Sequence, residues 1–286
     1  MKRATRLVLL AYVAALIVAI IVGRALFPAH PLLVALGADL AATLAIFAFS
    51  MAFDNSSFYD PYWSVAPLPM ALYWGFSSTA AHANGARQDI VIILLMFWGV
   101  RLTYNWYRGW QGLGHEDWRY VDMRARSGRG YPAVSLLAIH LFPTLIVFAG
   151  LLPAYAAMTY PLPLGWIDGL GTAMAAGAIV IETMADEQLR RFRAGGAGDG
   201  SAILSHGLWR YSRHPNYFGE NLFWWGLALL GIGAGAPWWW AIAGAVAITV
   251  MFVFVSVPLL DQRMRRRPGY EDHMKRVSAL VPWFPR

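Results

Sequence analysis

Residues 212–221, SRHPNYFGEN, combine side chains that can bind a ligand or move a proton. They precede a long hydrophobic stretch, and ionisable residues at the mouth of a membrane helix are costly enough to suggest a function. Pro215 favours the first turn of a helix, where its missing N–H costs nothing. The free N–H groups and positive dipole end of that helix would favour an anion beside His214, such as nucleotide phosphates. Asn216 and Glu220 would share one face of the helix because they are four residues apart.

A second group of ionisable residues recurs with helical spacing at the end of another apolar segment: Glu182, Asp186, Arg190 and Arg193. This spacing places them on one helical face. The simpler interpretation is an interfacial helix end whose arginines extend to the membrane surface. Glu182 weakens that interpretation because it lies deeper and would need a partner.

Further candidate ligand-binding residues lie just before or within the first motif: Arg210, Tyr211, Arg213 and Tyr217. Two arginines, tyrosine rings and a helix N-terminus could bind phosphates and a ribose or base. A positive anchor for anionic lipid headgroups is the alternative interpretation. Residues 265–272, RRRPGYED, are predicted to lie on the same side of the membrane. Tyr270 and Glu271 follow a Pro-Gly turn there and could close over a bound nucleotide.

In the N-terminal half, Asp60 and Tyr104 are candidate proton-handling residues at the predicted ends of apolar segments. Tyr104 is one turn from Arg108, and a buried tyrosine beside a carboxylate or an arginine can donate a proton. Aromatic residues at the ends of spans more often form membrane-interface belts. We interpret His140, which lies alone in an apolar segment, as a hydrogen-bonded packing residue. No set of His, Asp and Glu residues has metal-ligand spacing.

The elements that position these side chains are predicted to be membrane helices. The 286-residue chain is 58% hydrophobic and 14% charged, and several apolar runs reach the roughly 20 residues that span a bilayer. Long apolar runs without strand alternation predict an all-α, polytopic helix bundle. The first run is too long for a signal peptide and lacks a good cleavage site, so we expect it to be retained. We expect seven or eight spans, at about 7–27, 32–53, 62–80, 89–108, 133–157, 165–186, 216–234 and 237–259.

The distribution of basic residues predicts the orientation of these spans. With eight spans and both termini in the cytoplasm, 20 of the 23 Lys and Arg residues lie on the cytoplasmic side, as the positive-inside rule requires. The same rule explains the net charge of +7, and no recognition motif supports nucleic-acid binding. The absence of cysteine excludes disulfides, thiolate metal sites and a cysteine nucleophile.

Three motifs resemble those of the steroid 5α-reductase-like membrane family: SRHPNYFGE at 212–220, ADEQ at 185–188, and RPGYE at 267–271 with VPW at 281–283. More narrowly, the chain resembles the bacterial branch long catalogued as a domain of unknown function, over roughly residues 40–286. The resemblance implies an NADPH-dependent reductase of the bacterial inner membrane that saturates a C=C bond conjugated to a carbonyl. It also implies a single membrane domain, with N-terminal spans in 1–60, substrate-side spans in 61–160 and a cofactor-binding half in 161–286.

The resemblance implies roles for single residues of the cofactor site. Asp186 and Arg193 match acidic and basic cofactor contacts. Asn216 and Glu220 match the residues that lie near the nicotinamide. The steroid reductases carry a second arginine at a position that corresponds to about Ala202 in this chain. Arg190, Arg210 or Arg213 could take its place. A preference for NADPH over NADH therefore stays open.

The resemblance also implies roles on the substrate side. Tyr104 matches the tyrosine that polarises the substrate carbonyl, and Asp60 stands where that site has a glutamate. The steroid reductases read Gln-Glu before the third span, whereas this chain reads FYDP at 58–61. A steroid is therefore one of several lipophilic enones or enoyl lipids that could be the substrate.

The leading hypothesis is reduction of a lipophilic substrate that enters from the bilayer. Tyr104, assisted by Asp60 or another acid, would donate a hydrogen bond to the carbonyl oxygen while hydride reaches the β-carbon. The pattern RHPxY also occurs in isoprenylcysteine and phospholipid methyltransferases, which bind S-adenosylmethionine in a similar pocket. Gly219-Glu220 and the surrounding arginines favour reduction. A lipid-binding membrane protein without turnover is the second alternative.

Overall fold

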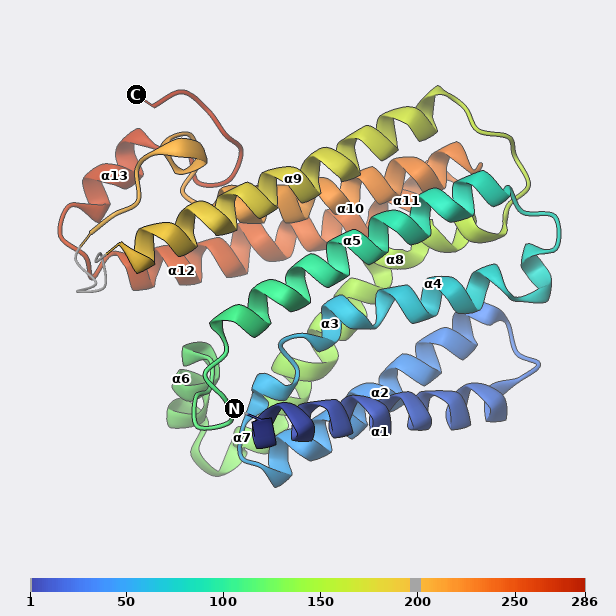
Figure 1. The fold of residues 1–286 in the computed structure, drawn as a ribbon, viewed down its shortest axis with the longest axis horizontal. Coiled ribbons are helices and arrows are strands. Elements are labelled where there is room, and N and C mark those ends of the chain that lie inside the picture. Colours follow the sequence, from blue (N-terminus) through green and yellow to red (C-terminus); the bar gives the residue numbers. More distant parts are fainter. Residues whose placement is uncertain (1, 196–201, 286) are drawn as a thin grey trace. The chain divides into compact units, whose positions relative to one another are not determined.

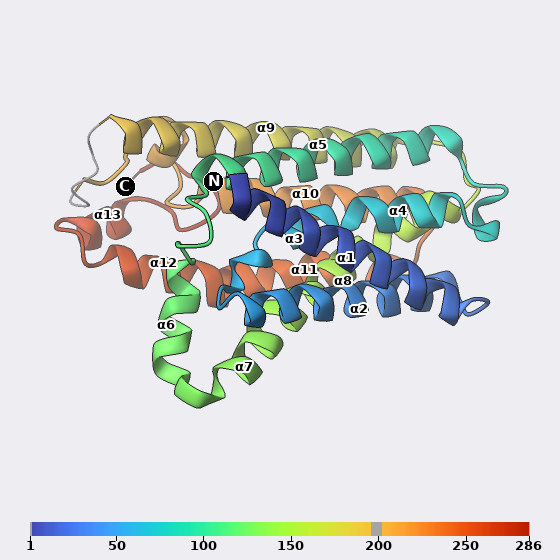
Figure 2. The same cartoon turned by 60° about the horizontal axis from the view of Figure 1, so that its bottom comes forward.

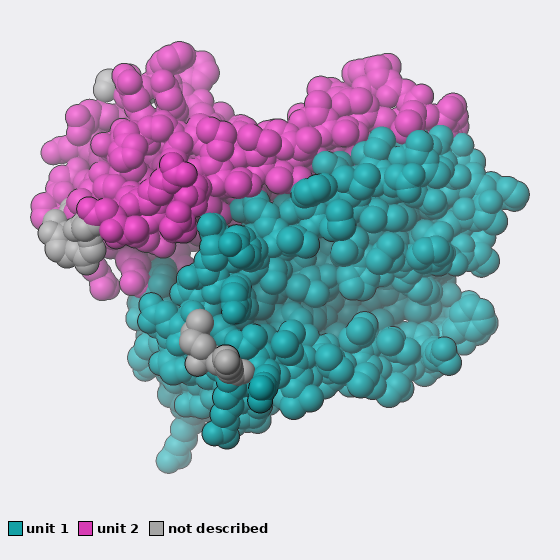
Figure 3. Space-filling view, in the orientation of Figure 1, with its two compact units in different colours: residues 1–151, 158–161 teal, residues 152–157, 162–286 magenta. Residues whose placement is uncertain are grey.

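The computed structural model describes residues 2–195 and 202–285 (Figure 1). These residues form helices and no strand, which confirms the predicted all-α fold for the described part of the chain. The chain divides into two compact units (Figure 3). Unit 1 comprises residues 1–151 and 158–161, and unit 2 comprises residues 152–157 and 162–286.

Unit 1 begins with two apolar helices, α1 (Lys2–Leu26) and α2 (Pro31–Ala52), which pack side by side (Figures 1 and 2). Pro31 occupies the first turn of α2, and Nδ1 of His30 accepts a hydrogen bond from the backbone N–H of Leu32 at 3.2 Å. Helix α5 (Gly85–Gly109) is capped by Asn84. These three helices match the predicted spans 7–27, 32–53 and 89–108 to within a few residues.

The segment predicted as a third span, 62–80, is not one helix. It forms α3 (Tyr62–Val65), α4 (Pro67–Gly75) and a 3₁₀ turn at Ser78–Ala80. Pro67 has no N–H to continue the hydrogen bonding of α3, so a new helix begins there. Each piece is too short to cross a bilayer by itself.

The rest of unit 1 contains one helix that the sequence pattern does not predict, α6 (Trp118–Ser127), which is capped by Asp117. The predicted span 133–157 is built from α7 (Tyr131–Val134), a π-helix at Ser135–Leu141 and α8 (Phe142–Thr159). His140 lies in the π-helix, fully buried. Its ring nitrogens lie 2.9 Å from the Ser135 carbonyl oxygen and 3.0 Å from the Ser50 hydroxyl. This confirms the prediction of a hydrogen-bonded packing histidine.

Unit 2 contains the helices that carry the first two motifs, α9 (Trp166–Ala194) and α10 (Pro215–Gly233). They are followed by α11 (Trp238–Met251), a π-helix at Phe252–Ser256, α12 (Val257–Met264) and α13 (Tyr270–Arg276). Helices α9 and α10 lie side by side (Figures 1 and 2).

Glycines set the close approach of α9 to α10. A Cβ atom on Gly171 would lie 2.8 Å from the backbone oxygen of Gly226, and one on Gly226 would lie 2.7 Å from the backbone nitrogen of Ala175. Small residues allow membrane helices to pack at this distance. The contact between the two helices therefore depends on the absence of side chains at these positions.

Six helices in the described part of the chain are long and apolar enough to span a bilayer, which indicates an integral membrane protein. They are Arg3–Leu26, Pro31–Ala52, Gly85–Gly109, Trp118–Thr159, Trp166–Ala194 and Trp238–Met264. The predicted number of seven or eight is thus higher than the number of such helices. Helix α10 coincides with the expected span 216–234, but its first turns carry Asn216, Glu220 and Asn221, which make it less apolar.

The glycine contact between α9 and α10 predicts a position-specific effect of alanine. Gly171→Ala should lower the thermal unfolding midpoint of the detergent-purified protein by at least about 3 °C, because the methyl group meets the backbone of α10. Gly177→Ala on the same helix is the matched control, since a Cβ atom there meets nothing within 4 Å. Alanine is the better helix former by about 1 kcal/mol, so Gly177→Ala should not lower the midpoint. Equal midpoints for both variants would contradict the packing argument.

Candidate functional site

One buried carboxylate holds the start of α10. Asp261 on α12 accepts hydrogen bonds from Nη2 of Arg213 at 2.7 Å and from the hydroxyl of Tyr270 at 2.6 Å. Its Oδ1 also lies 2.9 Å from Nε2 of His214. Asp261 is only 6% exposed, so these groups replace the water that an ionised carboxylate would otherwise need. Burial and the neighbouring carboxylate raise the pKa of Tyr270, which therefore stays a neutral donor.

The same arginine fastens the segment before α10 to the C-terminal segment. Nη1 of Arg213 donates to the backbone oxygens of Met274 at 3.0 Å and Val277 at 2.7 Å. Its backbone N–H donates to the Ser278 oxygen at 2.8 Å, and the Ser212 hydroxyl donates to the Leu280 oxygen at 2.8 Å. The described hydrogen bonds of Arg213 thus serve the fold. A cofactor role for Arg213 and Tyr270 stays a prediction.

His214 has a buried nitrogen that the fold leaves without a hydrogen-bond partner. The residue is 2% exposed and occupies the N-cap of α10, and no described protein atom pairs with its Nδ1. The ring stacks on that of Tyr217, with centroids 5.5 Å apart. The first N–H groups of a helix also lack intrahelical partners. Because an unpaired buried polar atom costs about 1–3 kcal/mol, this site favours a ligand or a water molecule that pairs with it.

Two other predicted site residues meet near the start of α10. The side-chain amide of Asn216 donates to the carboxylate of Asp186 on α9 at 3.2 Å. Glu220 is 3% exposed and accepts a hydrogen bond from the indole N–H of Trp224 at 2.8 Å. Gly219 allows this face of α10 to approach α9, because a Cβ atom there would lie 2.9 Å from Cβ of the buried Glu182.

The remaining residues predicted to contact the cofactor lie in different settings. Arg190 donates two hydrogen bonds to the carboxylate of Glu187, at 2.7 and 2.6 Å. The guanidinium of Arg210 lies 5.9 Å from the ring centroid of Tyr211. Glu271 is exposed in the first turn of α13. Arg193 is exposed in the last turn of α9, within electrostatic range of Asp186.

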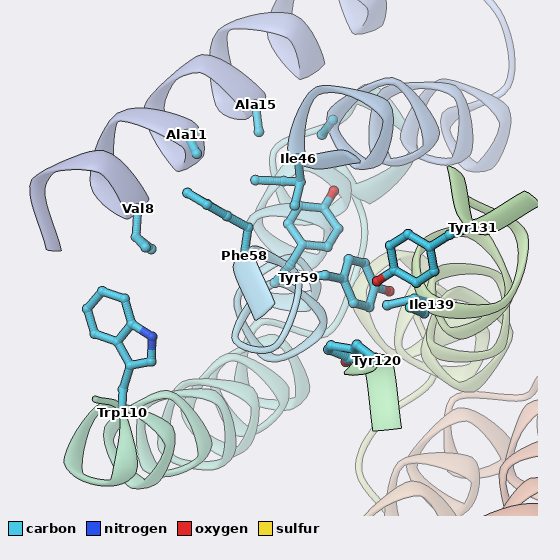
Figure 4. Close-up of a cluster of buried hydrophobic side chains, with 12 residues drawn as sticks. Val8, Ala11, Ala15, Ile46, Phe58, Tyr59, Trp110, Tyr120, Tyr131 and Ile139 are labelled. Carbon is cyan, nitrogen blue, oxygen red and sulfur yellow. The ribbon is translucent and has the colours of Figure 1, made fainter. Parts of the chain in front are cut away.

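In unit 1, the acid Asp60 is paired with a tyrosine that sequence reasoning missed. Its carboxylate accepts a hydrogen bond at 2.7 Å from the hydroxyl of Tyr120, which belongs to the buried cluster shown in Figure 4. Burial raises the pKa of Asp60 to about 6. The predicted partner, Tyr104, is 57% exposed, and the guanidinium of Arg108 lies 4.8 Å from its ring centroid. Asp60 thus has a direct phenol partner on α6.

The chain resembles known proteins over most of its length. Residues 46–277 match the family described as protein of unknown function DUF1295. A protein of Schizosaccharomyces pombe, described as uncharacterized, is 27% identical over 258 residues, which cover 80% of this chain and 73% of that protein. No solved structure matches the chain.

The hydrogen bonds of Asp261 predict a large loss of stability when its charge is removed. Asp261→Asn should lower the free energy of unfolding by about 3 kcal/mol, because Arg213 would remain buried without its carboxylate partner. Thermal or denaturant unfolding in detergent measures this loss. Asp272→Asn is the control: its carboxylate is exposed and pairs with Lys275 at the surface, so its midpoint should change little. If the Asp261→Asn variant is as stable as the wild type, the fold does not depend on this carboxylate.

Proposed function

The chain belongs to the DUF1295 family, and we propose that it is an NADPH-dependent membrane reductase that saturates a C=C bond conjugated to a carbonyl. The observation that best supports this proposal is the buried Nδ1 of His214 at the N-terminus of α10, which pairs with no atom of residues 2–195 and 202–285. A helix N-terminus favours phosphate groups. An imidazole nitrogen accepts a hydrogen bond from an amide or a hydroxyl, or donates one when protonated. NADPH carries all of these groups.

The polar residues around this helix start fit a dinucleotide. Asn216 and Asp186 are joined by a hydrogen bond of 3.2 Å, and both would bind the polar edge of the cofactor. Arg193 would bind a phosphate, and Glu220, fixed by its hydrogen bond from Trp224, would orient the nicotinamide. When bound, the nicotinamide supplies the hydride, and the protein supplies position and polarity.

The position of Tyr104 supports a lipophilic substrate. Phe97, Val100 and Tyr104 share one face of α5 by their spacing, and all three are exposed, by 59%, 62% and 57%. A molecule dissolved in the bilayer can therefore reach the phenol. We propose that Tyr104 donates a hydrogen bond to the substrate carbonyl oxygen, where negative charge develops. Asp60, whose pKa is raised to about 6 by burial, accepts a hydrogen bond from Tyr120 in the same unit.

The cofactor site predicts ligand-induced stabilisation. NADPH at 100 times its dissociation constant should stabilise the detergent-purified protein by about 2.7 kcal/mol, because it binds only the folded state. Asn216→Ala and Asp186→Asn should reduce the rise in the unfolding midpoint. Asn105→Ala, which removes an asparagine that pairs with Arg108 on α5 of unit 1, should preserve it.

The same measurement separates the alternative functions. A rise with S-adenosylmethionine alone would indicate a membrane methyltransferase. No rise with NADPH, NADH or S-adenosylmethionine would indicate a lipid-binding protein without turnover. Either outcome would overturn the reductase proposal.

The proposed role of Tyr104 predicts a loss of turnover without a loss of cofactor binding. Tyr104→Phe should lower kcat about 100-fold for whichever lipophilic enone supports NADPH oxidation, because the hydrogen-bond donor is removed. The midpoint rise with NADPH should not change. Tyr120→Phe is the comparison: unchanged turnover in Tyr104→Phe with a loss in Tyr120→Phe would transfer the role to the tyrosine that is bonded to Asp60.

A further inference from the structure

A cavity of about 610 Å³ lies at the end of α2 in unit 1, where residues of α2, α6 and α7 line it. Part of its lining is apolar and comes from Phe47 and Met51 of α2. Another part is charged and comes from Asp54, Arg124 and Arg129. Small-molecule sites commonly have volumes of this size. The cavity therefore offers one ligand both an apolar surface and charged groups.

The apolar and charged parts of the lining follow each other along the membrane normal. Helix α2 is long and apolar enough to span a bilayer, and Phe47 and Met51 lie in its last two turns. Asp54 follows the end of that helix, and Arg129 lies in the turn before α7. Leu44, three residues before Phe47, is 48% exposed, so the apolar part continues onto the outer surface of α2. A membrane lipid has the same order, with hydrocarbon chains below a polar headgroup.

Arg124 is committed to the protein and fixes the direction of Asp54. Its guanidinium forms ion pairs with the carboxylates of Asp54 and Glu116 and lies 4.0 Å from the ring centroid of Tyr131. It also donates to the backbone oxygen of Asp54 at 3.4 Å. Asp54 has a φ of 50°, a left-handed conformation that few residues other than glycine adopt. These contacts hold the carboxylate of Asp54 at the cavity.

Arg129 and Asp54 present opposite charges to a ligand in the cavity. Arg129 is exposed and forms no ion pair with any residue of 2–195 and 202–285. The side chain of Asp54 is 82% exposed although it contacts Arg124. Together with Glu116, the two arginines and Asp54 have no net charge. A purely anionic ligand would gain from Arg129 but would also meet the two carboxylates. A ligand that carries both charges pairs with both groups.

We propose that this cavity binds a zwitterionic phospholipid with a primary ammonium group, phosphatidylethanolamine. Its phosphate pairs with Arg129, its ammonium donates hydrogen bonds to Asp54, and an acyl chain lies against Met51. An arginine fork suits a phosphate, and a primary ammonium has three N–H donors for a carboxylate. The site lies wholly in unit 1 and does not depend on the reductase proposal.

Native mass spectrometry of the full chain in detergent measures the affinity for single lipids. Dioleoyl phosphatidylethanolamine should bind about fivefold more tightly than phosphatidylcholine with the same chains, because a trimethylammonium has no N–H to donate. Arg129→Gln and Asp54→Asn should each weaken the binding of phosphatidylethanolamine by about fivefold. Asparagine also adopts the left-handed conformation, so Asp54→Asn keeps the backbone. Arg126→Gln and Asp122→Asn are the matched controls, because both residues are exposed on α6 outside the cavity lining, and they should leave the affinity unchanged.

Glycerophosphoethanolamine, the same headgroup without acyl chains, distinguishes a lipid from a soluble ligand. It should bind at least about tenfold more weakly than the lipid, because it buries no apolar surface against Phe47 and Met51. Equal affinity would assign the cavity to a soluble phosphate ester and would overturn the proposal.

The lipid series has two further outcomes that contradict the proposal. Equal affinity for all lipids, with no effect of Arg129→Gln, would show that lipids only surround the protein. Tighter binding of phosphatidylglycerol that does not depend on Asp54 would show a site for anionic lipids instead. The unfolding midpoint without added lipid checks that each variant is folded. If Asp54→Asn is not folded, Arg129→Gln still decides, because in the described part of the chain Arg129 forms no ion pair that the fold could lose.

Discussion

A carboxylate withdrawn from water needs donors around it, and in unit 2 the donors to Asp261 come from segments far apart in the chain. Arg213 and His214 precede α10, whereas Tyr270 begins α13. Removing any one of them leaves a charge or a hydroxyl that is buried and incompletely paired. The start of α10 therefore cannot move without the C-terminal segment. That coupling gives His214 a fixed orientation, because Asp261 occupies one ring nitrogen and leaves the other at the helix N-terminus.

The packing of α9 against α10 adds a second constraint on the same end of the helix. Gly171, Gly219 and Gly226 lie where any Cβ atom would meet the neighbouring helix at 2.7 to 2.9 Å. The two helices are consequently held in one register, and that register brings Asn216 to Asp186. Polar groups at this end owe their geometry to contacts with backbone and small residues several turns away. In a membrane, van der Waals packing of this kind stabilises the association of helices, because no hydrophobic effect drives them together there.

Sequence reasoning predicted the helices that have long, uninterrupted apolar runs, such as α2 and α5. It was wrong for 62–80, because Pro67 divides that segment into short helices. It missed α6, whose residues 118–127 are mostly polar, and with it the hydrogen bond from Tyr120 to Asp60. The role of Asp261 was also missed: its partner Arg213 lies 48 residues away, and one sequence carries no signal for such a pair.

Burial alone does not distinguish a functional polar group from a structural one in this protein. In unit 1, Asp39 accepts a hydrogen bond from Tyr62 at 2.7 Å, and Asp60 accepts one from Tyr120 at the same distance. A phenol thus partners each of these two acids, which is what stability requires of a buried carboxylate. His214 differs, because among the described residues only one of its two ring nitrogens has a partner. A polar atom that a well-packed protein leaves unpaired is more informative than one that it pairs, since packing cannot explain it. The unpaired nitrogen of His214 therefore indicates a ligand at the start of α10 more strongly than the number of polar residues nearby does.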